Sequence, residues 1–190
     1  MRLYLSGPNK STRLMRIFLT GFMGSGKSYV GKRLAEREGL PFIDLDDCLE
    51  QQEGMSIAQI FAERGEDHFR AIESRLLRGI SALPMFVMAT GGGTPCFHEN
   101  MEWMNACGLT VFIDPTVDIL TRRLRSERDK RPLLHSTEEL SQLISEKLHT
   151  RRLYYEKADF HVRQTNPKQD VVRSISAHLL NLDAQSLLHE

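Results

Sequence analysis

Residues 21–28 read GFMGSGKS and directly follow the apolar run RIFLT at 16–20. The stretch matches the phosphate-binding pattern G-x-x-x-x-G-K-[ST] at every fixed position. Helix-forming residues begin near Lys27, so the pattern lies between an expected strand and an expected helix, the context in which it binds phosphate. We therefore predict a nucleoside triphosphate site here. The alternative is a glycine-rich turn with a chance Lys-Ser pair.

The residue types of this loop suit a phosphate. Glycines at 21, 24 and 26 let backbone N–H groups turn toward an anion, and the positive end of the following helix dipole adds to them. Lys27 would reach the β- and γ-phosphates of the nucleotide, and the Ser28 hydroxyl would bind Mg²⁺. GTPases, ATPases and small-molecule kinases share such a loop, so the loop alone identifies no reaction.

Short apolar runs alternate with longer segments of helical spacing along the chain. The runs are continuous in apolar character, which is typical of parallel strands buried on both faces. The sequence therefore predicts an α/β fold of three layers, with a five-stranded parallel sheet between helices. The expected strands are residues 16–20, 41–45, 85–90, 109–114 and 159–162, and the expected helices are 27–38, 56–63, 66–82, 98–106, 116–126, 137–157 and 170–181.

The chain of 190 residues is long enough for one sizeable core, and we expect a single domain from residue 15 to residue 182. Residues 1–14 are expected to form an extension outside the core, and residues 183–190 a tail. The polar, cationic stretch RSERDKRPLLHS, at about 125–136, interrupts the alternation of strands and helices. We predict a mobile loop there.

Lysine plus arginine and aspartate plus glutamate number 25 each, so the overall charge indicates no nucleic-acid or anionic-membrane partner. No apolar stretch approaches the roughly 18 residues that a membrane-spanning helix needs. Cys48, Cys96 and Cys107 have spacings that fit neither a disulfide framework nor a zinc ribbon. We therefore expect reduced thiols in a cytoplasmic protein.

Two carboxylates follow the second expected strand, in the stretch FIDLDD at 42–47. Ligands of open parallel sheets bind outside the carboxyl ends of the strands, so Asp44 and Asp46 are expected near the phosphate loop. One carboxylate can help to hold Mg²⁺ while the other accepts a proton from an acceptor hydroxyl. The alternative is a helix N-cap with a solvated neighbour.

Two further stretches offer groups for an acceptor. In GEDHFRAIE at 65–73, Arg70 and Glu73 lie three residues apart, so the glutamate can orient the guanidinium toward a ligand carboxylate. A surface ion pair of low energy would have the same spacing. In TGGGTPC at 90–96, three glycines after the third strand permit close approach of a ligand, or form a flexible turn.

Taken together, the motifs resemble those of the shikimate kinase family in order and spacing, from about Met15 to about Arg173. They are GFMGSGKS, FIDLDD, FRAIE, TGGGTPC and KRPLL. The resemblance implies a P-loop kinase of the nucleoside-monophosphate-kinase type with a mobile lid. Such an enzyme transfers the γ-phosphate of ATP to the 3-hydroxyl of shikimate, in the pathway to chorismate and the aromatic amino acids. The family is magnesium-dependent, cytoplasmic and usually monomeric.

The resemblance also implies roles on the donor side of the site. Lys27 and Ser28 are similar to the phosphate and magnesium contacts, and Asp44 to an aspartate of the metal shell. Arg131, stiffened by the proline that follows it, is similar to the lid arginine that closes over the transferring phosphoryl group. The expected ATP-binding residues are Gly24, Ser25, Gly26, Lys27, Ser28, Tyr29, Arg123 and Arg131.

On the acceptor side, Asp46 resembles the aspartate that contacts the reacting hydroxyl. Arg70, supported by Glu73, resembles one arm of a clamp on the shikimate carboxylate. The other expected substrate contacts are Phe61 and Phe69 as an apolar wall, Gly91, Gly92 and Gly93 as backbone contacts, and Arg151 as the second arm of the clamp. On periodicity alone, either aromatic residue is equally consistent with a place in the core.

The chain departs from the family pattern at TRRLYYEKAD, residues 150–159, where the family usually has Arg-x-Pro-Leu-Tyr. The proline is missing, so the second clamp residue is Arg151, or Arg152 in its place. For the adenine, Arg123 or Arg125 and the TNP at 165–167 resemble the family's contacts.

Two other functions compete with this prediction. A gluconate kinase of the same fold would also bind an acceptor carboxylate, although the joint presence of FIDLDD, GGG and KRPLL argues against it. A nucleotide-binding regulator with a decayed active site would have lost Lys27, Asp46 or Arg131, and all three are present.

Overall fold

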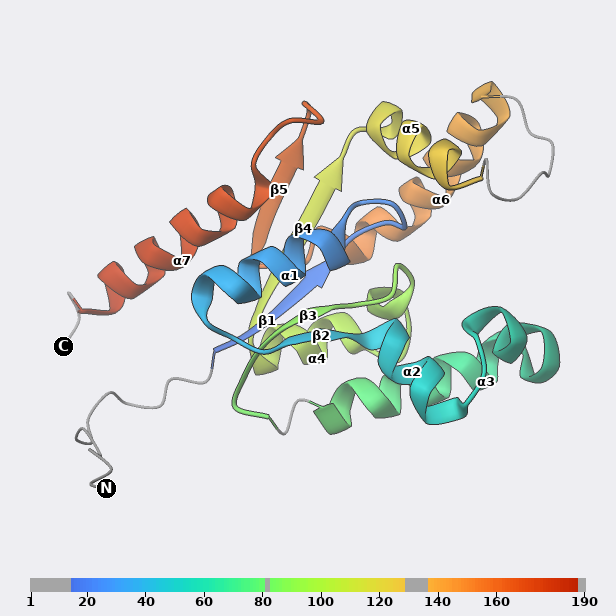
Figure 1. The fold of residues 1–190 in the computed structure, drawn as a ribbon, viewed down its shortest axis with the longest axis horizontal. Helices are drawn as coiled ribbons and strands as arrows, with labels where there is room; N and C mark the ends of the chain where they lie inside the picture. Colours follow the sequence, from blue (N-terminus) through green and yellow to red (C-terminus); the bar gives the residue numbers. More distant parts are fainter. Residues whose placement is uncertain (1–14, 81–82, 129–136, 188–190) are drawn as a thin grey trace, which may run out of the picture.

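A computed structural model describes residues 15–80, 83–128 and 137–187 of the chain. Its centre is a parallel sheet of five strands in the order β2-β3-β1-β4-β5 (Figure 1). The strands are β1 Met15–Thr20, β2 Phe42–Asp44, β3 Met85–Ala89, β4 Leu109–Pro115 and β5 Phe160–Gln164. The parallel five-stranded sheet predicted from the sequence is therefore confirmed.

Helices cover both faces of the sheet and give the fold its three layers (Figure 1). One face packs against α1 and α7, and the other against α2, α3 and α4, with α5 and α6 beside them. The helices are α1 Lys27–Glu38, α2 Leu45–Glu53, α3 Ile57–Ile80, α4 Asn100–Cys107, α5 Val117–Arg128, α6 Thr137–Tyr155 and α7 Val171–Leu187, with a short 3₁₀ helix η1 at Thr94–Cys96.

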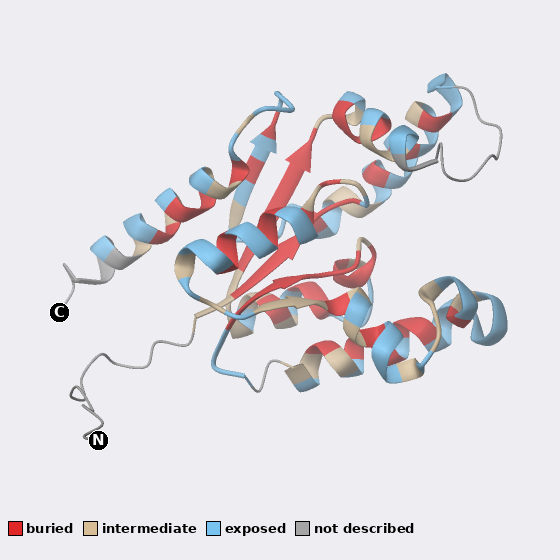
Figure 2. Ribbon diagram, in the orientation of Figure 1, coloured by how far each residue is buried: buried red, intermediate tan, exposed pale blue. Residues whose placement is uncertain are grey.

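The central strand β1 shows why its apolar run is unbroken. Ile17 and Leu19 belong to the core cluster under α1 and α7, whereas Phe18 belongs to the cluster under α2, α3 and α4. Successive residues of a strand point to opposite faces, and helices cover both faces of this sheet, so all three side chains are fully buried. Figure 2 shows this burial along the strands and on the inner sides of the helices.

The strand order brings three chain segments together at one edge. Strand β3 lies between β2 and β1, and Ala89 near its end pairs with both Asp44 and Leu19. The segments that follow these strands therefore begin side by side at the carboxyl edge of the sheet. They are the phosphate loop after β1, the carboxylates after β2 and the triple glycine after β3.

Several element boundaries differ from those expected. Helix α2 was not predicted, because the acidic stretch that begins it reads equally well as a strand end. Helix α3 runs from 57 to 80 across a non-helical Gly65 (φ 82°, ψ 170°), the break that separates the two expected helices. Helix α5 ends at Arg128 and α7 at Leu187, so each enters a segment expected as lid or tail.

The extension expected at 1–14 and the lid residues 129–136 lie outside the described part of the chain. Among the helices that the structure describes, none is long and apolar enough to cross a membrane.

Candidate active site

The phosphate loop connects β1 to α1 in a conformation that depends on glycine. Gly21 has φ 140° and Gly26, which precedes the helix, has φ 92°. A Cβ on Gly21 would lie 2.6 Å from the Ile113 carbonyl oxygen, so a side chain there would clash with β4 as well as strain the backbone. The loop therefore approaches the neighbouring strand closely and opens at the start of a helix, the geometry expected of an anion site.

Lys27 is buried within this loop. Its Nζ donates hydrogen bonds to the carbonyl oxygens of Gly21 (2.8 Å) and Phe22 (3.0 Å). Burial lowers the pKa of Lys27 to about 8, although the nearby carboxylates of Asp46 and Asp44 act in the opposite direction. The amine is thus mostly protonated at pH 7 and carries a positive charge beside the loop.

Asp44 is both a helix cap and a partner of the phosphate loop. Its Oδ1 accepts a hydrogen bond from the backbone N–H of Asp46 (3.2 Å) at the start of α2, and its Oδ2 accepts one from the Ser28 hydroxyl (2.5 Å). A hydroxyl and a carboxylate are hard oxygen donors of the kind Mg²⁺ prefers, and Mg²⁺ commonly takes its other ligands from phosphates and water. The donor set therefore fits a magnesium site. It also shows that the capping and functional interpretations of this aspartate are compatible.

Asp46 lies in the first turn of α2 against the triple glycine. A Cβ on Gly91 would be 3.0 Å from the Asp46 Oδ1 and 2.8 Å from the Glu73 Oε1. Burial raises the pKa of Asp46 to about 6, and the nearby carboxylates of Asp44 and Glu73 raise it further, with Lys27 opposing them. The carboxylate is therefore mostly ionised at pH 7 but basic enough to take up a proton.

Arg70 is buried on α3 between two carboxylates. Its Nη1 donates to Glu73 (2.9 Å) and its Nη2 to Glu66 (3.0 Å). A Cβ on Gly93 would lie 2.5 Å from Nη2, so the guanidinium rests against this glycine, and its Cζ lies 4.4 Å from the centre of the Phe97 ring. The absence of a side chain at Gly93 is what allows this packing.

Phe61 and Phe69 lie beside the same guanidinium. Their ring centres are 4.5 Å apart, and the Arg70 Cζ lies 5.8 Å from the first ring and 4.9 Å from the second. Phe69 is buried in the core cluster under α2, α3 and α4, and Phe61 packs against that cluster. The two rings are thus placed next to the site and within the core at once.

Arg151 and Arg152, adjacent on α6, point to different partners. The Nη1 of Arg151 donates to the Gly92 carbonyl oxygen (3.4 Å). Arg152 instead pairs with Asp114 at the end of β4 (2.8 Å) and with Glu156 (3.1 Å). The structure therefore places Arg151, and not Arg152, beside the triple glycine.

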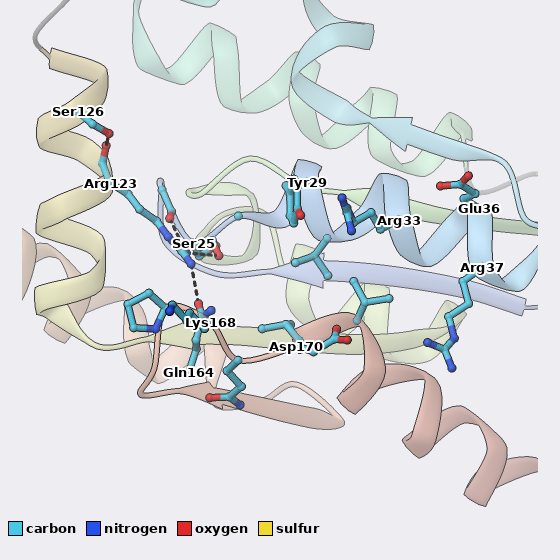
Figure 3. Close-up of a pocket in the computed structure, with 17 residues that line it drawn as sticks. Ser25, Tyr29, Arg33, Glu36, Arg37, Arg123, Ser126, Gln164, Lys168 and Asp170 are labelled. Carbon is cyan, nitrogen blue, oxygen red and sulfur yellow. Dashed lines mark hydrogen bonds between the residues drawn. The ribbon is translucent and has the colours of Figure 1, made fainter.

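A cavity of about 1000 Å³ lies between the phosphate loop, α1, α5 and the segment that joins β5 to α7 (Figure 3). Arg123 of α5 lines it beside the phosphate loop, and its Nη1 donates to the carbonyl oxygens of Gly24 (3.2 Å) and Ser25 (3.0 Å). The lining residues include Tyr29 of α1 and Pro167, the last residue of the TNP segment. Arg125, the alternative to Arg123, donates to the Thr137 hydroxyl (3.0 Å). The cavity adjoins the phosphate loop, as a nucleoside pocket would.

Sequence reasoning missed several residues that hold the site together. The Thr94 hydroxyl donates to the Glu73 Oε1 (2.5 Å), and the Tyr155 hydroxyl donates to the Gly92 carbonyl oxygen (2.5 Å). The Arg123 Nη2 donates to the Gln164 Oε1 (2.9 Å). The position of Thr94 directly after the triple glycine could have indicated a role in the site. No feature of the neighbouring sequence indicates such a role for Gln164. Arg131, expected on the lid, lies outside the described residues.

A phosphate loop after the central strand of a parallel sheet, with Arg70, Arg151 and Asp46 gathered at the same sheet edge, is typical of P-loop small-molecule kinases. A family model described as shikimate kinase matches residues 23–180. The chain therefore belongs to the shikimate kinase family, as the sequence motifs predicted.

Individual relatives agree. The chain is 44% identical over 168 residues to a shikimate kinase of Phocaeicola vulgatus, a match that covers 86% of this chain and 96% of the relative. It is 38% identical to a shikimate kinase of Aquifex aeolicus, covering 91% and 99%.

Solved structures show the same likeness. A shikimate kinase of Bacteroides thetaiotaomicron superposes with a TM-score of 0.80 at 38% identity, covering 88% of this chain and 97% of that one. A shikimate kinase of Acinetobacter baumannii in complex with shikimate has a TM-score of 0.75 at 34% identity, covering 91% and 94%. A gluconokinase of Sinorhizobium meliloti, 19% identical with a TM-score of 0.54 and coverage of 94% and 98%, shares the fold alone.

Proposed function

We propose that this chain transfers the γ-phosphoryl group of ATP to the 3-hydroxyl of shikimate. The observation that carries the proposal is the convergence of Arg70, Arg151 and Asp46 on the triple glycine, at the same sheet edge as the phosphate loop. Two guanidinium groups next to a basic carboxylate suit an acceptor that has both a carboxylate and a hydroxyl. Family membership supports the same assignment.

On the donor side, the loop from Gly24 to Ser28 binds the phosphates, with Tyr29 and Arg123 in the adjoining nucleoside pocket. Lys27 leaves its carbonyl partners in the loop and pairs with the β- and γ-phosphates when the nucleotide binds. Ser28 and Asp44 would hold Mg²⁺, which would neutralise phosphate charge. Arg131 arrives with the lid and stabilises the charge that spreads over the moving phosphoryl group.

On the acceptor side, Arg70 and Arg151 hold the shikimate carboxylate, with Glu73 fixing the first of them. Gly91, Gly92 and Gly93 let the ring approach the backbone, and Phe61 and Phe69 shape the apolar wall. These contacts fix the acceptor so that one hydroxyl faces the phosphate loop. Asp46 orients that hydroxyl and takes up its proton as the phosphoryl group moves.

We further propose that the enzyme works as a cytoplasmic monomer, without a nucleic-acid or membrane partner. The equal numbers of acidic and basic residues support the part of this proposal that concerns nucleic-acid and membrane partners. The cysteines Cys48, Cys96 and Cys107 form no disulfide in the structure, which supports the cytoplasmic location.

The test is a coupled assay of ADP release with MgATP and shikimate, with gluconate, and without an acceptor. The proposal predicts turnover with shikimate well above both other reactions. Faster turnover with gluconate would replace the proposed substrate, and equal ADP release in all three reactions would indicate an ATPase.

A further inference from the structure

Carboxylates occupy three of the five N–H donors of the Arg70 guanidinium. Its Nε donates to the Glu66 Oε1 (3.2 Å), and its Nη2 donates to the same oxygen (3.0 Å). Its Nη1 donates to the Glu73 Oε2 (2.9 Å). Two carboxylates thus surround one positive charge.

The edge that Glu66 occupies is one where a carboxylate binds arginine with two parallel hydrogen bonds. An incoming carboxylate that takes this edge competes with Glu66 for the Nε and Nη2 donors. One that approaches the remaining N–H groups of Nη1 and Nη2 still meets the repulsion of the negative charge already there.

The two glutamates differ in how firmly they are held. The side chain of Glu73 is fully buried and accepts a hydrogen bond from Thr94 (2.5 Å). The side chain of Glu66 is 54% exposed and follows directly on Gly65, where α3 is non-helical (φ 82°). Glu73 is thus a fixed support, whereas Glu66 can turn into water at little cost in packing.

We propose that Glu66 is an internal competitor of the acceptor carboxylate, and that it leaves Arg70 when the acceptor binds. This inference rests on the proposed function. A carboxylate that contacts only Arg70 merely exchanges one carboxylate for another. A carboxylate that also reaches Arg151 gains a second guanidinium, so Glu66 selects acceptors that engage both arginines.

The test measures the dissociation constant of shikimate by calorimetry in the wild type, Glu66→Gln and the matched control Asp67→Asn. Asp67 is exposed, adjacent in sequence and of equal charge, and the described structure shows no hydrogen bond from Arg70 to it. Glu66→Gln should bind shikimate about two- to fivefold more tightly, the range expected from loss of one exposed competing ion pair, whereas Asp67→Asn should bind as the wild type does.

Glu66→Ala is a second variant and should also bind more tightly. If Glu66 merely supported Arg70, its removal would not tighten the binding of shikimate. Unchanged or weaker binding in both Glu66 variants would therefore overturn this inference and leave the proposed function intact. Equal tightening in Asp67→Asn also overturns it, because the effect would then be one of general charge. If the wild type does not bind shikimate, the proposed function fails and this inference fails with it.

Discussion

Replacing Asp46 with asparagine should slow the enzyme and stabilise the fold at the same time. Burial, together with Asp44 and Glu73, raises the pKa of Asp46 from 3.8 to about 6. The folded protein then binds the proton more tightly than the unfolded chain does, so the ionised carboxylate lowers the free energy of unfolding at pH 7. A neutral amide of nearly the same shape removes that cost.

The structure sets the size of the effect. The rise from 3.8 to about 6 corresponds to about 3 kcal/mol, at about 1.36 kcal/mol per pH unit. Asp46 is only partly buried by exposed area, which reduces the expected gain to about 1 to 3 kcal/mol. For a chain of 190 residues this is a rise in Tm of about 3 to 10 °C.

The gain should depend on pH in a defined direction. Below about pH 4 the wild-type carboxyl is protonated in the folded state, so the variant gains little. As the pH rises through about 6, the carboxyl of the folded wild type loses its proton and the free energy of unfolding of the wild type falls. The difference in Tm between variant and wild type should therefore grow and then level off above about pH 7. Thermal unfolding followed by circular dichroism between about pH 4.5 and 8 measures this difference.

The same variant should lose turnover by about two orders of magnitude or more with little change in ATP affinity, because Asp46 no longer accepts the hydroxyl proton. Asp47→Asn, at the exposed neighbouring position in the first turn of α2, is the control and should change neither turnover nor the pH dependence of Tm. Near-normal turnover of Asp46→Asn would refute its role as base. An unchanged Tm at pH 7 would refute the charge penalty.

Three further predictions concern the proposed roles of arginines. Arg151→Ala should raise the KM for shikimate about tenfold or more, whereas Arg152→Ala should mainly lower Tm, as steady-state kinetics and melting would show. Gly93→Ala should push the Arg70 guanidinium aside and raise the same KM, because the new Cβ would lie 2.5 Å from Nη2; a normal KM would contradict this packing. Arg131→Ala should lower turnover by roughly three orders of magnitude while calorimetric ATP affinity changes little, and an equal loss of both would contradict its proposed role.

The strands and the phosphate loop could be predicted because their signals are local. A continuous apolar run such as 109–114 reflects burial on both faces, and the loop pattern is short and contiguous. The order of the strands could not be predicted, because it depends on pairing between segments far apart in the chain, such as Asp44 with Ala89. Helix α2 was missed because the aspartate that ends β2 also caps the helix.

The acceptor site could be predicted in part. The spacing of Arg70 and Glu73 marked one arm of the clamp, but a surface pair would have the same spacing, and only the burial of both residues in the fold distinguishes the two. Arg151 was expected as the second arm with Arg152 as the alternative, because the missing proline left the register of the motif open. The choice between the two depends on Asp114, which is distant in sequence and pairs with the second arginine.

We have proposed that the arginines at the triple glycine bind an acceptor carboxylate beside the phosphate loop. The most direct measurement compares turnover of shikimate with turnover of its methyl ester, at equal concentrations with MgATP. The ester retains every hydroxyl but lacks the negative charge that Arg70 and Arg151 would bind. We expect rapid turnover of shikimate and little or none of the ester, whereas comparable rates on both compounds would show that these arginines do not bind the carboxylate.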